Sequence, residues 1–216
     1  MDAQGNAEAW PKKLEMSDHV LSQYARAIEP LNEATDPKPL GIAAAYPTNA
    51  QLSLASQDTH EVLVFPENIR VSNVREGDIE FLTKHLLAES VDIAALEAKL
   101  CVTKLTGHHA FVCAHANRDY RCACAGPKLI EWLQTKTPQD WTIYASSHYG
   151  GHRFAGNCIV YPEGHWYGML NKPEDVDKLV QAFTGDGELA LESLWRGCTG
   201  MTKESQLKLY ARATSQ

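Results

Sequence analysis

The amino-acid sequence predicts an α/β fold, because short apolar runs alternate with longer amphipathic runs along its second half. The apolar runs have the length of strands and are bounded by glycine, proline or asparagine, which favour turns. In the longer runs, leucine, isoleucine and valine recur at the spacing of one helix face. We therefore expect the order strand, helix, strand, hairpin, helix in the second half of the chain.

This second half, residues 105–216, is expected to form one layered domain. Its strands are predicted over residues 110–114, 141–146, 157–161 and 166–170. Helices are predicted to begin at Pro127 and Pro173, since proline is favoured at the first helical position. A shorter helix is predicted to end near Trp195.

The first half, residues 1–104, is expected to be a smaller α/β region that carries no functional site. Residues 1–15 are expected to be a mobile lead or an incomplete first element. The elements predicted after them are a helix capped by Ser17, strands over 51–55 and 60–66, a helix over 76–87 and a helix capped by Ser90.

Composition excludes several classes of protein. The chain has 216 residues, of which 44% are hydrophobic and 22% are charged, as is ordinary for a globular protein. A formal net charge of −7 without a basic stripe argues against nucleic-acid binding. No apolar run approaches the roughly 20 residues of a membrane helix. Neither nucleic acid nor membrane is therefore an expected partner, and the sequence leaves the oligomeric state open.

Cysteine usage indicates the compartment. Six cysteines in a chain of this length do not indicate a disulfide scaffold. The N-terminal residues MDAQGNAEAW lack the charged and apolar regions of a secretory signal. We therefore expect a reducing compartment, the cytoplasm, with an organellar location left open. In such a compartment Cys and His clusters are more often metal-binding or catalytic.

One stretch, residues 113–156, carries a candidate metal centre. Two soft thiolate donors, Cys113 and Cys122, stand in a C-x8-C spacing, and two imidazoles, His148 and His152, follow in H-x3-H. Two glycines between the histidines let the backbone turn tightly, so that both rings can converge on one point. Two Cys and two His suit zinc or an iron–sulfur cluster, and the donor types alone do not choose between them.

The motifs around these residues resemble the sucrase/ferredoxin-like family. They are FVCAHANRDYRC, GPKLIEWL and HYGGHRFAGN, together with VLVFPENI, GHWYGML and LWRG. The resemblance spans about residues 8–197. It implies a thioredoxin-like ferredoxin layer in the second half and a smaller, degenerate thioredoxin-like copy in the first. It also implies a 2Fe–2S cluster, outside the Rieske class, on Cys113, Cys122, His148 and His152.

From the resemblance we expect an electron carrier rather than an enzyme, working in redox or iron homeostasis. Its partners would be an electron-donor protein and an electron-acceptor protein. All four proposed ligands follow Phe111, so a fragment from about Lys104 to the C-terminus should still bind iron if it folds.

Three alternatives stay open. Plant-type relatives often carry a second cysteine three positions after the ligand, where this chain has Ala125, and Cys124 is therefore a rival for the role of Cys122. Structural zinc would use the same four side chains in a closed site without redox activity. A thioredoxin-like thiol oxidoreductase would use Cys122 and Cys124, although C-x-C is a poor substitute for the usual C-x-x-C.

Several neighbouring side chains have two possible roles. Arg118 and Arg121 either donate hydrogen bonds to the cluster sulfurs or pair with Asp119. The aromatic residues Tyr149, Phe154 and Trp166 either shield the site from water or belong to the core. Among the remaining histidines, His115 and His165 are expected to support the site or the fold, and the pair His108-His109 is expected in a solvated turn.

Overall fold

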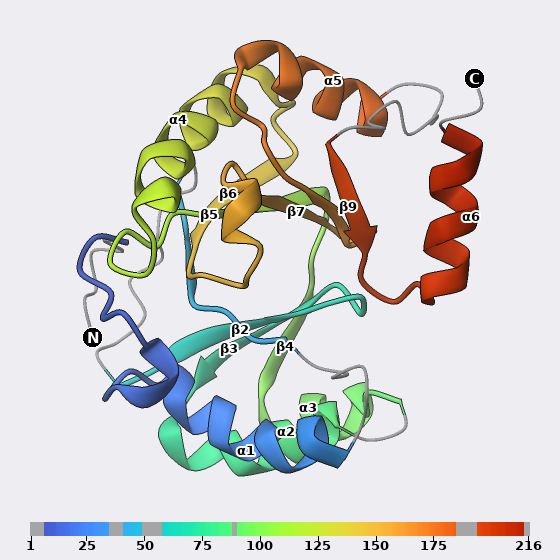
Figure 1. The fold of residues 1–216 in the computed structure, drawn as a ribbon. Coiled ribbons are helices and arrows are strands. Elements are labelled where there is room, and N and C mark those ends of the chain that lie inside the picture. The colour runs from blue at the N-terminus through green and yellow to red at the C-terminus, as the bar shows by residue number, and fades with distance from the viewer. Residues whose placement is uncertain (1–6, 35–40, 49–57, 88–89, 185–193, 214–216) are drawn as a thin grey trace.

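The computed structural model describes residues 7–34, 41–48, 58–87, 90–184 and 194–213. Two β-sheets lie one above the other, with two long helices of the second half along one side of the molecule and the helices of the first half along the opposite side (Figure 1). The α/β class predicted from the sequence is confirmed.

The larger sheet has six strands in the order β1-β6-β5-β7-β8-β9. Its strands are β1 (Ala45–Pro47), β5 (His108–Cys113), β6 (Trp141–Ser146), β7 (Cys158–Tyr161), β8 (His165–Tyr167) and β9 (Trp195–Cys198). Strands β5 and β6 are parallel, and the other neighbouring pairs are antiparallel. From β5 onward the expected order of strand, helix, strand, hairpin and helix is present.

The parallel pair determines where the site lies. Cys113 at the end of β5 is in register with Ser146 at the end of β6. Because the two strands run in the same direction, the segments that follow them leave from the same edge of the sheet. Ligand sites of parallel α/β sheets lie at this edge. The chain segments after Cys113 and after Ser146 are therefore neighbours.

Two helices cover one face of the larger sheet. They are α4 (Tyr120–Lys136) and α5 (Pro173–Thr184), and Figure 1 shows both on the side away from the smaller sheet. Their apolar stripes meet the alternate residues of the strands that point to this face. The core between them consists of fully buried aliphatic and aromatic side chains, including Val112, Leu129, Leu133, Ile143, Val160, Val176 and Leu179.

Helix α4 begins seven residues before the predicted start at Pro127. Asp119 caps it by accepting a hydrogen bond from the backbone N–H of Arg121 at 2.9 Å, and an aspartate with this geometry is a strong start signal. Pro127 consequently lies inside the helix. The residue before it is Gly126, whose missing side chain eases the clash that proline makes with its predecessor. The predicted helix start at Pro127 is therefore wrong, because the aspartate N-cap, and not the proline, sets where the helix begins.

The smaller sheet belongs to the first half of the chain. Its strands β2 (His60–Val64), β3 (Ile69–Val74) and β4 (Cys101–Lys104) are all antiparallel, in the order β2-β3-β4. Helices α1 (Leu21–Ala34), α2 (Ile79–Leu86) and α3 (Ile93–Lys99) enclose a second core with it. A thioredoxin-like copy needs a parallel pair, and the described strands of this sheet contain none.

The first half also builds part of the larger sheet. Strand β1 pairs with β6, and the buried side chains of Ala7, Trp10 and Leu14 pack against Ala114 and Ala145 beside the ends of β5 and β6. Leu14 begins the short 3₁₀ helix η1 (Leu14–Met16). The expected mobile lead is therefore wrong for residues 7–14, because the indole of Trp10 gains by burial against the sheet.

At the C-terminal end a strand that the sequence did not predict joins the larger sheet. Trp195 begins β9, and its indole N–H donates to Nδ1 of His165 in β8 at 3.1 Å. Helix α6 (Lys203–Ala213) follows. The predicted strand over 51–55 and the predicted helix before residue 194 lie outside the described residues.

Candidate metal centre

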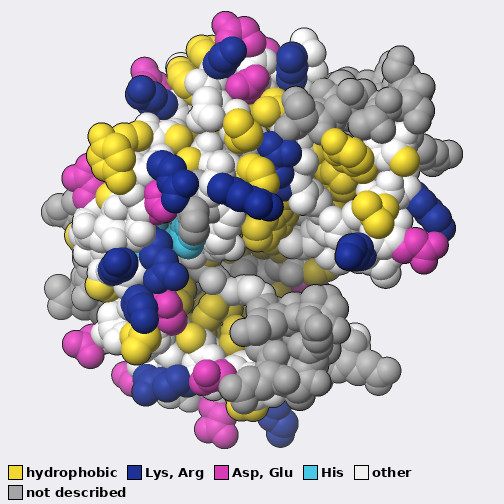
Figure 2. Space-filling model, in the orientation of Figure 1, with side chains coloured by type: hydrophobic (Ala, Val, Ile, Leu, Met, Phe, Trp, Pro, Cys, Tyr) yellow, Lys and Arg dark blue, Asp and Glu magenta, His cyan; other side chains and the backbone are white. Residues whose placement is uncertain are grey.

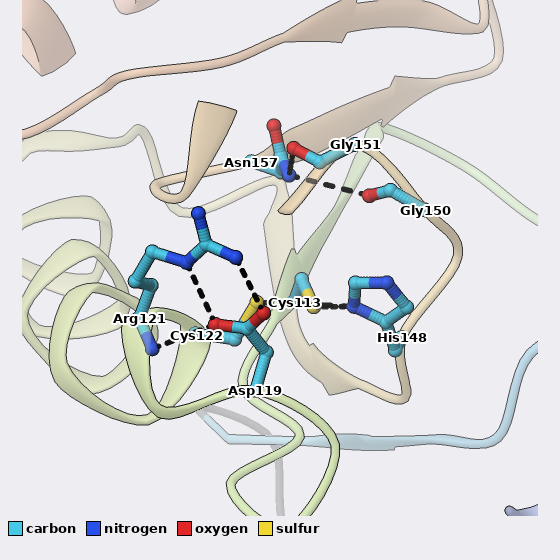
Figure 3. Close-up of polar contacts among 8 residues, drawn as sticks. All are labelled: Cys113, Asp119, Arg121, Cys122, His148, Gly150, Gly151 and Asn157. Carbon is cyan, nitrogen blue, oxygen red and sulfur yellow. Dashed lines mark hydrogen bonds and ion pairs between the residues drawn. The ribbon is translucent and has the colours of Figure 1, made fainter. Parts of the chain in front are cut away.

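The structure brings together three of the four proposed ligands. The sulfur atoms of Cys113 and Cys122 and a ring nitrogen of His148 all lie within 4.8 Å of one another (Figure 3). Nδ1 of His148 is 3.6 Å from Sγ of Cys113 and 3.8 Å from Sγ of Cys122. Each cysteine is 1% exposed and His148 is half-buried. Two sulfurs and an imidazole form a soft donor set suited to zinc or iron–sulfur chemistry.

Cys113 is placed by the central strand of the larger sheet. It ends β5, and its N–H donates to the backbone carbonyl of Asn157 at 3.2 Å. Helix α4 passes close above it at Gly126, where a Cβ atom would lie 2.6 Å from the carbonyl oxygen of Cys113. A side chain at this position would push the helix, and Cys122 with it, away from the strand.

Cys122 lies in the first turn of α4. The N-cap residue Asp119 accepts the backbone N–H of Cys122 on its carbonyl oxygen at 3.0 Å. The Asp119 carboxylate also accepts two hydrogen bonds from the guanidinium of Arg121, at 3.0 and 2.8 Å. Of the two roles considered for Arg121, the structure therefore shows pairing with Asp119.

The two thiols have different acidities. A hydrogen bond from the thiol of Cys113, followed by one from His148, lowers the pKa of Cys122 to about 5, against the opposing effect of burial. The same contact with Cys122, together with burial, raises the pKa of Cys113 above its usual range. These contacts therefore favour the thiolate on Cys122, at the helix start, over the thiolate on Cys113. A thiolate is the form of cysteine that binds metals.

His148 is positioned through a second histidine. Its backbone N–H donates to Nδ1 of His115 at 3.3 Å, and Nε2 of His115 makes a hydrogen bond of 3.0 Å with the carbonyl oxygen of Pro11. With Nδ1 as acceptor, Nε2 must carry the proton, so His115 is the neutral Nε2–H tautomer. Burial lowers the pKa of His115, which favours this neutral form. The supporting role expected for His115 is present.

The turn after His148 depends on its glycines. Gly150 has a φ of +105° and Gly151 a φ of +68°, and L side chains are strained in this region. The buried amide of Asn157 holds the turn by donating to the carbonyl oxygens of Gly150 at 3.4 Å and of Gly151 at 3.0 Å (Figure 3). The tight turn expected from the sequence is therefore present, and Asn157 fixes its shape.

His152 follows this turn and begins the 3₁₀ helix η3 (His152–Phe154), but its side chain lies outside the described part of the structure. Its role as the fourth ligand remains a prediction. Cys124, the rival of Cys122, is exposed and is not part of the group formed by Cys113, Cys122 and His148.

The pair His108-His109 is not in a solvated turn. Both residues belong to β5, and His109 is only 3% exposed, with Nδ1 3.3 Å from the hydroxyl oxygen of Tyr144. Two consecutive histidines look polar, but the alternation of a central strand turns one of them inward. Burial lowers the pKa of His109 and favours its neutral form.

The family follows from comparison with known proteins. The family model of the sucrase/ferredoxin-like proteins matches residues 3–197. The chain belongs to the sucrase/ferredoxin-like family. The donor group of Cys113, Cys122 and His148 lies inside the matched region. No solved structure gives a significant match.

The curated relatives described here are yeast proteins. Altered inheritance of mitochondria protein 32 of Meyerozyma guilliermondii is 26% identical over 222 residues, covering 88% of this chain and 75% of that protein. The protein of the same name from Kluyveromyces lactis is 48% identical over 103 residues, covering 41% and 31%. Actin patches distal protein 1 of Saccharomyces cerevisiae is 28% identical over 122 residues, covering 47% and 38%.

Sequence reasoning missed two contributors to the site. Asn157 stands directly before the apolar run of β7, and an asparagine between a glycine and a strand is a signal for turn support. Trp10 had no such signal, because its partner His115 is 105 residues away in the chain, and the two rings meet with centroids 5.6 Å apart.

No helix within the described ranges has the length and apolar character needed to cross a membrane.

Proposed function

We propose that this protein is an electron carrier that holds one 2Fe–2S cluster on Cys113, Cys122, His148 and His152. One observation carries the proposal. A strand end, a helix start and a glycine turn, separate in the chain, bring two sulfurs and an imidazole nitrogen within 4.8 Å of one another. His152 follows His148 by one tight turn, and the family match covers the same residues.

The surroundings suit such a group. The two cysteines are buried, and the contacts of Cys122 with Cys113 and His148 lower its pKa, which favours the thiolate that a metal needs. Tyr149 packs edge-on against Trp166 at 5.2 Å between ring centroids, and its hydroxyl donates to the carbonyl of Phe111 at 3.0 Å. These aromatic rings restrict water near the sulfurs, and solvent exposure is one of the factors that set the potential of iron–sulfur centres.

When bound, a 2Fe–2S cluster supplies a one-electron redox couple. Two thiolates and two neutral imidazoles carry less negative charge than four thiolates. We therefore expect a midpoint potential above the value of about −400 mV typical of plant-type ferredoxins, toward the range of about −150 to +300 mV of Rieske centres. The partners would be an electron donor and an electron acceptor, in redox or iron homeostasis.

The compartment is part of the proposal. The name shared by two of the relatives above refers to the inheritance of mitochondria. The name is a reason to look for the protein in mitochondria as well as in the cytoplasm. Fractionation of cells that express it with a small C-terminal tag would show which compartment holds it.

Two alternatives use Cys122 as well. Structural zinc would occupy the same donors, although a spacing of C-x8-C is longer than that of most zinc sites. A thiol oxidoreductase would use the low pKa of Cys122. A nucleophilic thiolate must reach its substrate, however, and the side chain of Cys122 is 1% exposed. Both alternatives are therefore less well supported than the cluster.

The deciding experiment is metal and sulfide analysis of protein purified without oxygen. We expect about two iron atoms and two acid-labile sulfides per chain, a red-brown colour, and a paramagnetic resonance signal after reduction. Zinc without sulfide would establish the structural alternative. Metal-free protein with a reversible disulfide between Cys122 and Cys124 would establish the thiol alternative.

A further inference from the structure

The face that carries the candidate metal centre is basic, although the whole chain has a formal net charge of −7. In Figure 2, Lys and Arg side chains gather on several sides of the histidine that is visible on this face. Four arginines are the basis of the argument and are called the basic rim: Arg118, Arg121, Arg153 and Arg196. Two flank the start of α4, and two lie at the loop that follows His148.

Arg153 and Arg196 share one aromatic ring. Their guanidinium carbons lie 4.6 and 4.4 Å from the centroid of Phe154. Such cation–π contacts stabilise a cation beside the ring, but they do not neutralise it. Within the described residues neither guanidinium is paired with a carboxylate. The structure thus fixes two positive charges side by side next to the turn of Gly150 and Gly151.

The other two arginines are partly compensated. Arg121 binds Asp119, and Nη1 of Arg118 lies 3.8 Å from Glu15. Among the described residues, two carboxylates against four guanidiniums leave the rim positive. Since the chain as a whole is negative, this charge is local to the face of the site. Local charge of this kind steers partners of opposite sign and fixes their orientation.

Exposed apolar side chains lie within the rim. Tyr120, next to Arg121, is 80% exposed, and Met169 is 47% exposed. The backbone N–H of Met169 donates to the carbonyl of Phe154 at 3.0 Å, so it neighbours the Arg153–Arg196 pair. Met169 also has a φ of +65°, an uncommon conformation for a residue with a side chain. Tyr, Met and Arg are the residue types enriched at protein interfaces.

We propose that the basic rim, with Tyr120 and Met169, is the docking surface for an acidic redox protein that exchanges electrons with the site. This inference rests on the proposed function. A protein partner agrees with the pattern better than a nucleic acid or a membrane surface does. Carboxylates stand among the arginines, the total charge is negative, and the apolar groups are single side chains rather than the face of an amphipathic helix.

The test uses the purified protein with its cluster and two redox proteins of opposite charge. Flavodoxin hydroquinone is an acidic one-electron donor, and cytochrome c is a basic acceptor. Stopped-flow absorbance gives the second-order rate constant with each protein between about 10 and about 300 mM salt, a range over which the screening length falls from about 30 Å to less than about 10 Å. We expect the rate constant with flavodoxin to fall about tenfold or more. The rate constant with cytochrome c should not fall.

Two variants and one matched control locate the effect. Arg153→Glu should remove most of the salt dependence with flavodoxin. Lys178→Glu, an equal charge change at an exposed position on α5, should leave it in place. Tyr120→Ala should lower the rate constant at every salt concentration without changing the salt dependence. Circular dichroism and the visible spectrum establish that each variant is folded and loaded.

Three results would overturn the docking surface while the proposed function stands. The first is a rate constant with flavodoxin that rises with salt. The second is an equal effect of Arg153→Glu and Lys178→Glu, which would point to total charge. The third is salt-sensitive binding to phosphatidylserine vesicles that Arg153→Glu abolishes, without any effect on the flavodoxin reaction. Protein without a cluster, by contrast, would refute the proposed function and the docking surface together.

Discussion

The two sheets of this protein use their polar side chains differently. Around the three-stranded sheet, the polar groups pair with each other. The hydroxyl of Tyr24 lies 2.7 Å from Nε2 of His60, and Asp78 lies 3.3 Å from Lys99. At the edge of the six-stranded sheet, two sulfurs and an imidazole face one another instead. The first arrangement stabilises a fold, whereas the second leaves donors directed at a common point.

The difference follows from strand direction. Strands β5 and β6 are parallel, so the segments after Cys113 and Ser146 leave the sheet side by side. In the antiparallel sheet of β2, β3 and β4, successive strands end at opposite edges. One parallel pair is therefore enough to create a place where side chains from different segments converge.

The two halves are not independent, however. The boundary predicted at residues 104 and 105 stays a prediction, since β1 of the first half is a strand of the larger sheet and Trp10 packs beside it. A fragment from Lys104 would lack both. Retention of iron by such a fragment therefore remains a prediction, and its failure to fold would reflect the missing support rather than missing ligands.

The largest expected effect is the loss of bound iron on substitution of Cys122 but not of Cys124, two residues further along the chain. Cys122→Ser should abolish the iron and the visible spectrum, because its thiolate faces Cys113 and His148. Cys124→Ser is the matched control and should leave both almost unchanged, since its side chain is exposed. Metal analysis and absorbance of the two variants measure this. Loss of iron in Cys124→Ser with retention in Cys122→Ser would show that the assignment of the ligands is wrong.

The sequence was sufficient to predict the α/β order of the second half and the convergence of Cys113, Cys122 and His148. Local signals carried them, namely apolar runs, the spacing of Cys113 and Cys122, and the glycines before His152. It was insufficient for contacts between distant segments. Trp10 and His115 are neighbours only in the folded chain, and strand β3 was not predicted because its alternation breaks at Asn73. Burial of His109 likewise depends on the neighbouring strands.

The second prediction compares the two cores. Trp10→Ala and Leu96→Ala each empty a buried position and should each lower the free energy of unfolding by about 3 kcal/mol. Only Trp10→Ala should alter the paramagnetic resonance spectrum of the loaded protein, because Trp10 packs on His115 and Leu96 belongs to the core of the smaller sheet. Chemical denaturation and resonance spectra measure the two effects. Equal spectral changes would mean that the site responds to global stability rather than to local support.

The third prediction concerns two partly buried histidine contacts, one in each half. His115→Ala removes the acceptor for the N–H of His148 and should cost about 1–3 kcal/mol of stability, together with a shift in the midpoint potential. His115→Asn retains an acceptor oxygen and should recover part of the shift. His60→Ala, which breaks the contact with Tyr24 in the other half, should lower stability without moving the potential. A potential unmoved by His115→Ala would contradict the positioning role.

The smallest expected effect is the ionisation of the Cys122 thiol in the metal-free protein. With its pKa lowered to about 5, Cys122 should be ionised in the metal-free protein at pH 7, whereas a cysteine in the unfolded chain ionises near pH 8.5. The sign follows from this depression. Thiolate formation stabilises the folded state above the unfolded pKa, and the contribution is lost as pH falls from about 8.5 through 5. Ultraviolet absorbance near 240 nm should report about one thiolate per chain at pH 7, disappearing with a midpoint near 5. Cys122→Ser should remove this signal, whereas Cys124→Ser should retain it. A midpoint near 8.5 in the unsubstituted protein would show that Cys113 and His148 do not act on Cys122 in the absence of metal.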